Sequence, residues 1–497
     1  MTPAGDPARI PVVVGVGEIN DRPAQDAAGL DPVDLMGTAL GRADADAGGG
    51  WLARCERILV VPQISFRTLD VRDGLARVTG RARAGIEQAP VASGDTPVRL
   101  LQAAAEAIAA GQAQIVAIVG GEALRTAARR QAASGSSGAP LFSGAAAEAS
   151  PLRHRYGLVT PSDIYPLYEN ALRAELGQTL AEAQAETGAI WSLMSQVAAS
   201  SEGAWLRTPR TAREIIDPTT DNRPIAFPYT KLMVANASVN QGAAAIVTSL
   251  AAARGAGIAE DRLIYIGAGA AAHEPDEPLA RAGWTTSPSM QVSIERTMAL
   301  NRLAVSDLDM VELYSCFPCV PKMARRVLGW AADKPVTVHG GLTFGGGPIG
   351  NYMGHAIAAM VRRLRTGGRH GLLFANGGYC SHNHSIVLSR LPPAPNAFGQ
   401  KSRCQQKADS LRGPVPLLTD GIEGHLPVET YTAVYRRDGD PDYGVVLSRA
   451  PTGERVIARV APDDTRSIAY LTDGASQPVG ATGVNRRIRD KLIWTAA

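Results

Sequence analysis

The order of apolar and polar positions predicts buried strands that alternate with amphipathic helices through the first part of the chain. Pro11 to Val16 and Ile58 to Val61 are short apolar runs of the kind found in buried strands. The pattern from Pro97 to Ala110 is helical, and the β-branched run Ile115 to Val119 leads into Gly120-Gly121, which indicates a strand followed by a loop. Strands and helices that alternate in this way predict a mostly parallel sheet covered by helices.

The second half of the chain repeats this alternation after a stretch of different character. Residues 125–230 are rich in Ala, Ser and Gly up to Ser150 and then become helical, with Trp191 and Trp205 as expected anchors. We interpret this stretch as an insertion. Beyond it, the predicted elements are strands at Ala243 to Ser249, Leu263 to Ile266, Met310 to Leu313 and Leu372 to Ala375, with a helix around Met290 to Leu300.

The C-terminal part has a third pattern. A proline-rich linker, Leu391 to Ala397, precedes a polar stretch, and from Val415 the apolar positions alternate in short runs. The predicted strands are Thr430 to Tyr435, Tyr443 to Leu447 and Arg455 to Val460. Short alternating strands separated by turns predict a small all-β, OB-like domain.

Composition narrows the class of protein. A chain of 497 residues is expected to form about two to four domains, and 45% hydrophobic with 20% charged residues is ordinary for a globular protein. The net charge is +3, and the chain has no basic block with interleaved aromatic residues, so we expect no nucleic-acid partner. Five cysteines do not make a disulfide framework, and no apolar run is long enough to span a membrane. The expected compartment is the cytoplasm, without membrane attachment.

A glycine-rich segment marks the candidate site. Gly340 to His355 contains seven glycines, and Ile357, Met360, Val361 and Leu364 follow it at helical spacing. Glycine allows a backbone to approach a ligand closely. Because the loop ends where a helix begins, free N–H groups are expected there, and such groups bind anions or polar ligands.

Seven segments in order resemble the type 1 thiolase-like proteins of the thiolase superfamily. They are Gly94 to Pro97, Gly120 to Ala123, Phe227 to Met233, Asn236 to Ala244, Tyr314 to Pro318, the glycine-rich loop, and Asn376 to Tyr379. The resemblance implies an α/β thiolase fold, a layered αβαβα body of two pseudo-symmetric halves. It places the N-terminal half at 1–124 plus 231–258, a loop domain at 125–230, the C-terminal half at 259–392, and an additional β domain at 413–497.

The resemblance also implies the ligand. An acetyl-CoA acetyltransferase-like protein of lipid metabolism binds acyl-CoA or CoA, here between the insertion and the glycine-rich loops. We expect CoA as a substrate moiety, no other cofactor and no metal. We expect the protein to be a homodimer or a monomer. The residues expected to contact CoA or substrate are Ser238, Gly346, Gly347, Asn351, Asn376, Gly377 and Gly378.

The four catalytic positions of a thiolase are altered in this chain. When the sequences are aligned on Leu101-Gln102, Pro97 replaces the nucleophilic cysteine. Gly347 falls on the histidine of the Gly-His-Pro loop, Tyr314 on the asparagine of the Asn-Glu-Ala-Phe loop, and Asn376 on the second cysteine. Acyl transfer through a cysteine needs a thiolate, a base and an oxyanion hole together. The standard thiolase mechanism therefore cannot be carried over.

Other residues could supply chemistry. His355, on the first turn of the helix after the loop, could be a base, or it could simply pack under the loop. Cys380, His382 and His384 alternate, so in a strand all three would share a face, as a nucleophile with its base or as zinc ligands; alternatively, they stand together at a strand end by chance. Cys316 is a second candidate nucleophile.

Tyr314 suggests a different chemistry. Thiolase-like steroid side-chain aldolases resemble this loop and have a tyrosine in the same place. A phenol at this position could deliver a proton to a β-hydroxyl group or remove one. Alternatively, Tyr314 is a polar ring that lines a pocket.

Three hypotheses follow. The first, which we rank highest because the loops stay dense in reactive side chains, is an enzyme that acts on carbon–carbon or thioester bonds of acyl-CoA. It would use Cys380 or Cys316 together with His355. The second is a retro-aldolase that cleaves a β-hydroxyacyl-CoA with Tyr314, the C-terminal domain replacing a separate partner domain. The third is an acyl-CoA-binding protein without catalysis.

Overall fold

A nine-stranded mixed sheet runs through the body of the protein in the order β3-β2-β4-β7-β1-β8-β11-β10-β9. The computed structural model describes residues 5–24, 29–134, 151–393, 398 and 404–497. The strands of this sheet are β1 (Pro11–Asn20), β2 (Arg57–Val60), β3 (Ile86–Gln88), β4 (Ile115–Ala123), β7 (Asn240–Ser249), β8 (Ile264–His273), β9 (Met310–Glu312), β10 (His370–Gly377) and β11 (His382–Ser389).

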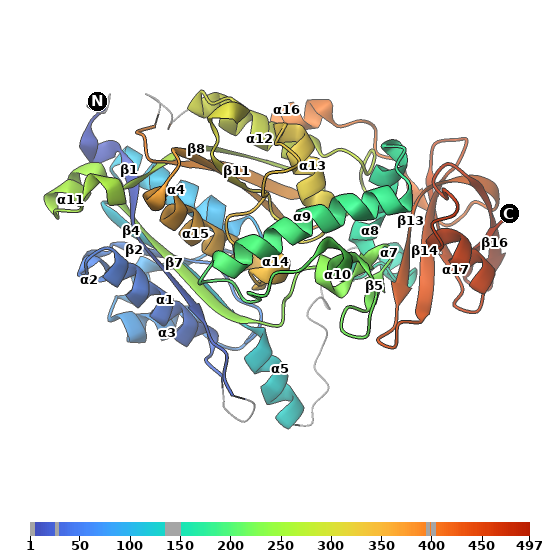
Figure 1. Ribbon diagram of the computed structural model, residues 1–497, viewed down its shortest axis with the longest axis horizontal. Helices are drawn as coiled ribbons and strands as arrows, with labels where there is room; N and C mark the ends of the chain where they lie inside the picture. Colours follow the sequence, from blue (N-terminus) through green and yellow to red (C-terminus); the bar gives the residue numbers. More distant parts are fainter. Residues whose placement is uncertain (1–4, 25–28, 135–150, 394–397, 399–403) are drawn as a thin grey trace.

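Helices form three layers, one between the two halves of this sheet and one outside each half (Figure 1). In the middle layer, α4 (Thr96–Ala110) and α15 (Tyr352–Thr366) contact both β7 and β11. Outside β1, β4 and β7 lies α1 (Pro32–Asp46), with α2 (Trp51–Arg54) and α3 (Val71–Thr79) beside it. Outside β8 and β11 lie α12 (Pro288–Asn301) and α16 (Cys404–Leu411). The remaining helices of the body are α11 (Leu250–Gly255), α13 (Cys319–Leu328) and α14 (Gly341–Phe344).

The prediction of a mostly parallel sheet is wrong. β2 pairs in parallel with β3 and β4, and β10 with β9, but β7 runs antiparallel to both β4 and β1. The insertion connects β4 to β7, and after it the chain returns through the sheet in the opposite direction. The four residues Gly378–Ser381 form a short turn between β10 and β11, and only antiparallel strands can be joined this way.

The insertion is mostly helical among its described residues. It contains α5 (Leu124–Ala133), α7 (Pro151–Arg155), α8 (Pro161–Glu175), α9 (Leu180–Ser200), α10 (Ala212–Ile216), β5 (Pro224–Ala226) and β6 (Tyr229–Thr230). Both expected anchors are buried. Trp191 donates its indole N–H to Thr343 Oγ1 at 3.0 Å, which holds α9 against the glycine-rich loop. The Ala/Ser/Gly-rich residues 135–150 lie outside the described residues, as do residues 394–397 of the predicted linker.

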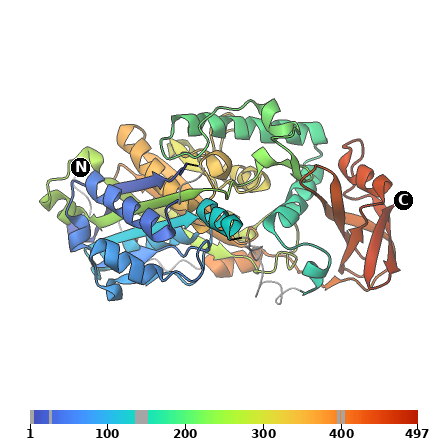
Figure 2. The ribbon, with the colours of Figure 1, turned by 90° about the horizontal axis from the view of Figure 1, so that it is seen from below.

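The C-terminal strands form a second sheet at the opposite end of the molecule from α1 (Figure 2). Its strands are β12 (Leu418–Thr419), β13 (Gly424–Tyr435), β14 (Pro441–Arg449), β15 (Arg455–Val460), β16 (Thr482–Ile488) and β17 (Lys491–Ala496). One helix, α17 (Thr465–Thr472), was not predicted. The sheet also takes in β5 and β6 of the insertion, through the pair Val434 and Ala226.

A buried arginine fastens this domain to the body. The Arg455 side chain is fully buried, and it pairs with Glu429 at 2.6 Å and donates to the carbonyl oxygen of Arg281 at 2.9 Å. The C-terminal domain therefore has a fixed place beside α8 and the segment around residue 281. Among the described residues, no helix is both long enough and apolar enough to cross a lipid bilayer.

Candidate functional site

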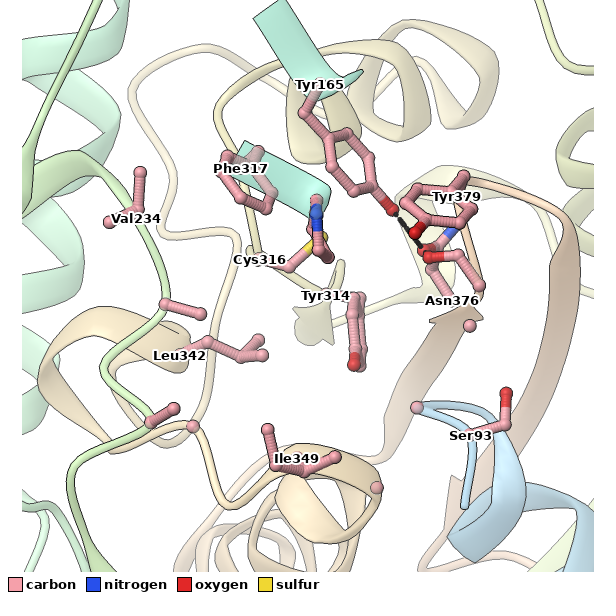
Figure 3. A pocket seen from close by; sticks show the side chains of 18 of the residues that line it. Ser93, Tyr165, Val234, Tyr314, Cys316, Phe317, Leu342, Ile349, Asn376 and Tyr379 are labelled. Carbon is pink, nitrogen blue, oxygen red and sulfur yellow. Dashed lines mark hydrogen bonds between the residues drawn. The ribbon is translucent and has the colours of Figure 1, made fainter. Parts of the chain in front are cut away.

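A pocket of about 480 Å³ opens where the insertion meets the loops of the two halves (Figure 3). Each wall comes from a different part of the chain. The lining residues are Ala92 to Gly94, Thr160 to Ser162, Tyr165, Val234, Ala235, Ala237, Tyr314, Cys316, Phe317, Leu342, Gly347, Ile349, Gly350 and Asn376 to Tyr379. Its walls are mainly apolar, with a few hydroxyl, thiol and amide groups, as expected for a site that binds an organic ligand.

Two helix N-termini meet at this pocket. Ser93 and Gly94 line it directly before α4, and Ile349 and Gly350 line it directly before α15. The residues at the caps, Asp95 and Asn351, make no side-chain hydrogen bond to the first turn of either helix. The N-terminal ends of both helix dipoles therefore give this side of the pocket a partial positive charge.

The side chain of Tyr314 points into the pocket (Figure 3). Its φ of 43° is in the left-handed region, which is strained for a tyrosine, and it directs the ring toward Gly94. A Cβ on Gly94 would lie 2.0 Å from the Tyr314 hydroxyl, so only glycine admits the ring there. Burial raises the pKa of Tyr314 well above its usual value. The phenol is therefore a neutral hydrogen-bond donor at physiological pH.

Of the two cysteines expected to act as nucleophiles, Cys316 lines the pocket and Cys380 does not. Burial raises the pKa of Cys316 to about 12 and that of Cys380 to about 11. The prediction that Cys380 shares a strand face with His382 and His384 is wrong, because Cys380 lies in the turn before β11 with a φ of 63°. Its backbone N–H donates to the hydroxyl of Tyr165 at 3.1 Å.

These thiols should be unreactive in the folded protein. A thiol with a pKa of about 11 is ionised to only about one part in 10³ at pH 8, and the thiolate is the reactive form. We expect intact-protein mass spectrometry to show no rapid addition of iodoacetamide at pH 8, whereas the unfolded chain should take up five groups, one for each cysteine. Alkylation of Cys316 or Cys380 within minutes in the native protein would contradict this.

His355 lies on α15 but faces away from the pocket. Its Nδ1 bonds to Glu18 Oε1 at 2.6 Å, and its ring stacks on His339 with centroids 5.4 Å apart. Although burial raises the pKa of Glu18, the hydrogen bond from His355 and the neighbouring positive charge of Arg362 lower it to about 2. His355 thus packs beneath the glycine-rich loop, held by a carboxylate from β1.

This cluster also holds the three potential metal ligands that lie closest together among the described residues. Glu18, His339 and His355 offer ligand atoms within 4.8 Å of one another, all buried. The guanidinium of Arg362, however, already pairs with the second oxygen of Glu18. A cation at that distance opposes a divalent ion, so the arrangement suits an ion pair better than a metal.

His382 lies at the start of β11, outside the pocket lining. Its Nε2 is 2.8 Å from Asp276 Oδ1, and its Nδ1 is 3.1 Å from Nδ1 of His273, directly opposite on β8. His384 lies two residues further along β11, with Nε2 facing Gln102 of α4. Neither histidine lines the pocket that holds Cys316 and Tyr314.

Four of the seven expected binding residues line the pocket, namely Gly347, Asn376, Gly377 and Gly378. Ser238 is exposed outside it. Gly346, with a φ of 101°, lies against Gln241, since a Cβ there would be 2.1 Å from Oε1. Asn351 packs against Gly120, with both side-chain polar atoms buried and unpaired.

Sequence reasoning missed two lining residues in particular. Ser93 directly precedes a matched motif, Gly94 to Pro97, and this position at a helix start was the available signal. Tyr165 comes from the insertion, for which the sequence offered no motif. Its hydroxyl lies 3.3 Å from Asn376 Oδ1 and 3.2 Å from the carbonyl oxygen of Gly378 (Figure 3).

Comparison with known proteins shows which family the chain resembles. Residues 408–489 match the model of the thiolase-like protein type 1 additional C-terminal domain. A monomeric SCP2-thiolase like protein type 1 from Mycobacterium smegmatis aligns over 99% of both chains, with a TM-score of 0.82 and 29% identity. None of the curated proteins matches the sequence.

Two more distant structures share the fold of the body. The Ltp2-ChsH2(DUF35) aldolase aligns over 77% of this chain and 98% of its own, with a TM-score of 0.59 and 19% identity. Human mitochondrial 3-ketoacyl-CoA thiolase in complex with CoA aligns over 78% and 99%, with a TM-score of 0.55 and 15% identity. The predicted α/β thiolase fold is thus confirmed, and so is the predicted likeness to the type 1 thiolase-like proteins with an additional C-terminal domain.

Proposed function

We propose that the protein binds an acyl-CoA in this pocket and cleaves a carbon–carbon bond of a β-hydroxyacyl-CoA without a covalent intermediate. The observation that carries the proposal is the hydroxyl group of Tyr314. It points into the pocket, and it makes no hydrogen bond to any other described residue. By contrast, the hydroxyls of Tyr165 and Tyr379, which also line the pocket, are engaged with Asn376 and Val159.

The charge around the pocket suits this chemistry. Retro-aldol cleavage leaves negative charge on the thioester oxygen as an enolate forms. Tyr314 offers a hydrogen-bond donor, and the N-termini of α4 and α15 offer partial positive charge on the same side. A neutral phenol with a raised pKa stabilises an oxyanion without itself becoming charged.

The arrangement favours this function over acyl transfer through a cysteine. Cys316 has a pKa of about 12, and no histidine lines the pocket to deprotonate it. His355, the expected base, is bonded to Glu18 outside the pocket. The additional C-terminal domain also agrees with the proposal, since one relative of similar fold is an aldolase that includes a DUF35 component. Here the extra domain would take the place of a separate partner.

Two measurements test the proposal. Calorimetry with CoA and acetyl-CoA should give saturable binding below millimolar ligand. Incubation with a panel of β-hydroxyacyl-CoAs should release an aldehyde or ketone together with the shortened acyl-CoA, without free CoA as a second substrate. The absence of binding at millimolar ligand would refute the pocket assignment.

The outcomes separate the three candidate functions. Tight binding without turnover of any panel member would support a non-catalytic acyl-CoA-binding protein. An acyl group found by mass spectrometry on Cys316 or Cys380 after incubation with acetyl-CoA would support acyl transfer instead. Carbonyl release with no protein adduct supports the retro-aldolase.

A further inference from the structure

Building on the proposed function, we propose that Ser93 and Asp95 are its proton acceptor: Ser93 contacts the β-hydroxyl group of the substrate and relays the proton to the carboxylate of Asp95. Tyr314 supplies the oxyanion contact but, as a neutral phenol, cannot accept this proton. The reaction therefore needs a base elsewhere in the pocket, and neither His355 nor His382 lines it.

Ser93 is fixed in the position that the relay requires. Its side chain lines the pocket, and its hydroxyl group donates to Asp95 Oδ1. Its backbone is held by Thr96 from both directions. The amide N–H of Ser93 donates to Thr96 Oγ1 at 3.2 Å, and its carbonyl oxygen accepts from the N–H of Thr96 at 3.0 Å. A hydroxyl that donates to a carboxylate keeps its lone pairs free for a proton from the ligand.

The carboxylate of Asp95 is bonded to Ser93 and does not cap its own helix. An aspartate at a helix N-cap usually accepts hydrogen bonds from the N–H groups two or three residues later. In α4 the first of these positions is Pro97, which has no N–H, and the second is Val98. Asp95 makes no capping bond, because its backbone has helical angles (φ −85°, ψ −12°) rather than the extended ones of a capping residue, and its carboxylate is bonded to Ser93 instead. The carboxylate is therefore buried and oriented toward Ser93.

Two glycines bring the relay and the phenol to the same point. A Cβ on Gly377 would lie 1.9 Å from Ser93 Oγ and 2.9 Å from Asp95 Oδ1, so glycine is required for their placement. Gly94, between the two relay residues, touches the hydroxyl of Tyr314. The proton acceptor, Ser93 with Asp95, and the hydrogen-bond donor, Tyr314, therefore lie next to Gly94. The acceptor would serve the β-oxygen of the substrate, and the donor would serve its thioester oxygen.

In the proposed step, Ser93 Oγ takes the proton of the β-hydroxyl group as its own proton passes to Asp95. The β-oxygen becomes a carbonyl, and the bond between the α and β carbons breaks. Its electron pair forms the thioester enolate, which is stabilised by Tyr314. The proton held by Asp95 then returns through Ser93 to the α carbon, which regenerates the carboxylate, so the net products are a carbonyl compound and an acyl-CoA.

Several charged and titratable groups face Asp95. They are His273 on β8, His384 on β11, Arg99 on α4 and Tyr314 after β9. Burial lowers the pKa of His384 to about 4, and burial also lowers the pKa of His273. Both histidines are therefore neutral near pH 7. Within the described part of the chain, Asp95 forms no salt bridge.

The experiment compares Ser93→Ala and Asp95→Asn with the wild type on the most active β-hydroxyacyl-CoA. Each should lower kcat by about 10²- to 10³-fold with KM changed less than about threefold. The asparagine still accepts a hydrogen bond from Ser93, so it preserves the structure but not the base. The acidic limb of the kcat–pH profile should be present in the wild type and in Tyr314→Phe and lost in Asp95→Asn.

A matched control is Asp276→Asn, an exposed carboxylate that bonds His382 on the neighbouring strand. It should keep both the wild-type kcat and the acidic limb. Full activity of Ser93→Ala with an active wild type would overturn the relay while leaving the proposed function intact. An unchanged acidic limb in Asp95→Asn would do the same. A wild type that turns over no β-hydroxyacyl-CoA would refute the function and the relay together.

Discussion

Replacing Tyr314 with phenylalanine should lower kcat for β-hydroxyacyl-CoA cleavage by about 10²- to 10⁴-fold and leave the dissociation constant of CoA within about twofold. The change removes only the oxygen that faces the ligand. The ring keeps its place against Gly94 and Tyr352, whose ring meets it edge-on at 6.0 Å. Steady-state kinetics together with calorimetry on the same preparation measures both quantities.

A second tyrosine serves as the control. Tyr443 is in the C-terminal domain and does not line the pocket, and its hydroxyl donates to the carbonyl oxygen of Gly157 at 2.7 Å. Tyr443→Phe loses a hydrogen bond but should turn over substrate at the wild-type rate. If Tyr314→Phe retained full activity, the phenol would have no role in the chemistry. The retro-aldolase proposal would then lose its main support.

Apolar runs predicted most strands of the body because those strands are buried on both faces. The run Ile115 to Val119 is a strand, and it continues to Ala123 with every residue buried. β11 was not predicted as an element, since His382, Asn383, His384 and Ser385 interrupt its apolar pattern. Asn383 lies in the interior only because it bonds to Asn376 and Ser289, and a sequence does not show such partners.

The outline of the site was predictable and its chemistry was not. The glycine-rich loop and the Asn376 loop both contribute residues to the pocket, and the sequence pointed to them because their motifs and the start of the following helix are local features. The role of His355 depends on Glu18, which is 337 residues away in sequence. Burial by neighbouring segments likewise raises the pKa of Cys316, which the sequence does not show. The hydrogen bond between Ser93 and Asp95, directly before Pro97, is also visible only in the structure.

The insertion is fastened to the body by a buried ion pair, and breaking it should cost about 3–5 kcal/mol of unfolding free energy. Lys322 on α13 contacts Glu169 on α8 at 2.6 Å, with side-chain exposures of 2% and 3%. The second oxygen of Glu169 accepts from the hydroxyl of Tyr229 at 3.0 Å. In Lys322→Met the carboxylate stays buried without its cation, so urea unfolding followed by tryptophan fluorescence should show the loss.

The double variant Lys322→Met/Glu169→Leu separates the two causes of such a loss. If the cost arises from the uncompensated charge, removing the carboxylate as well should recover most of the stability, because apolar residues of similar size can replace a buried pair. If the double variant is as unstable as the single one, lost packing is responsible instead. Arg213→Ala, which breaks an exposed pair with Asp217, should barely change the unfolding curve, since solvent screens that interaction.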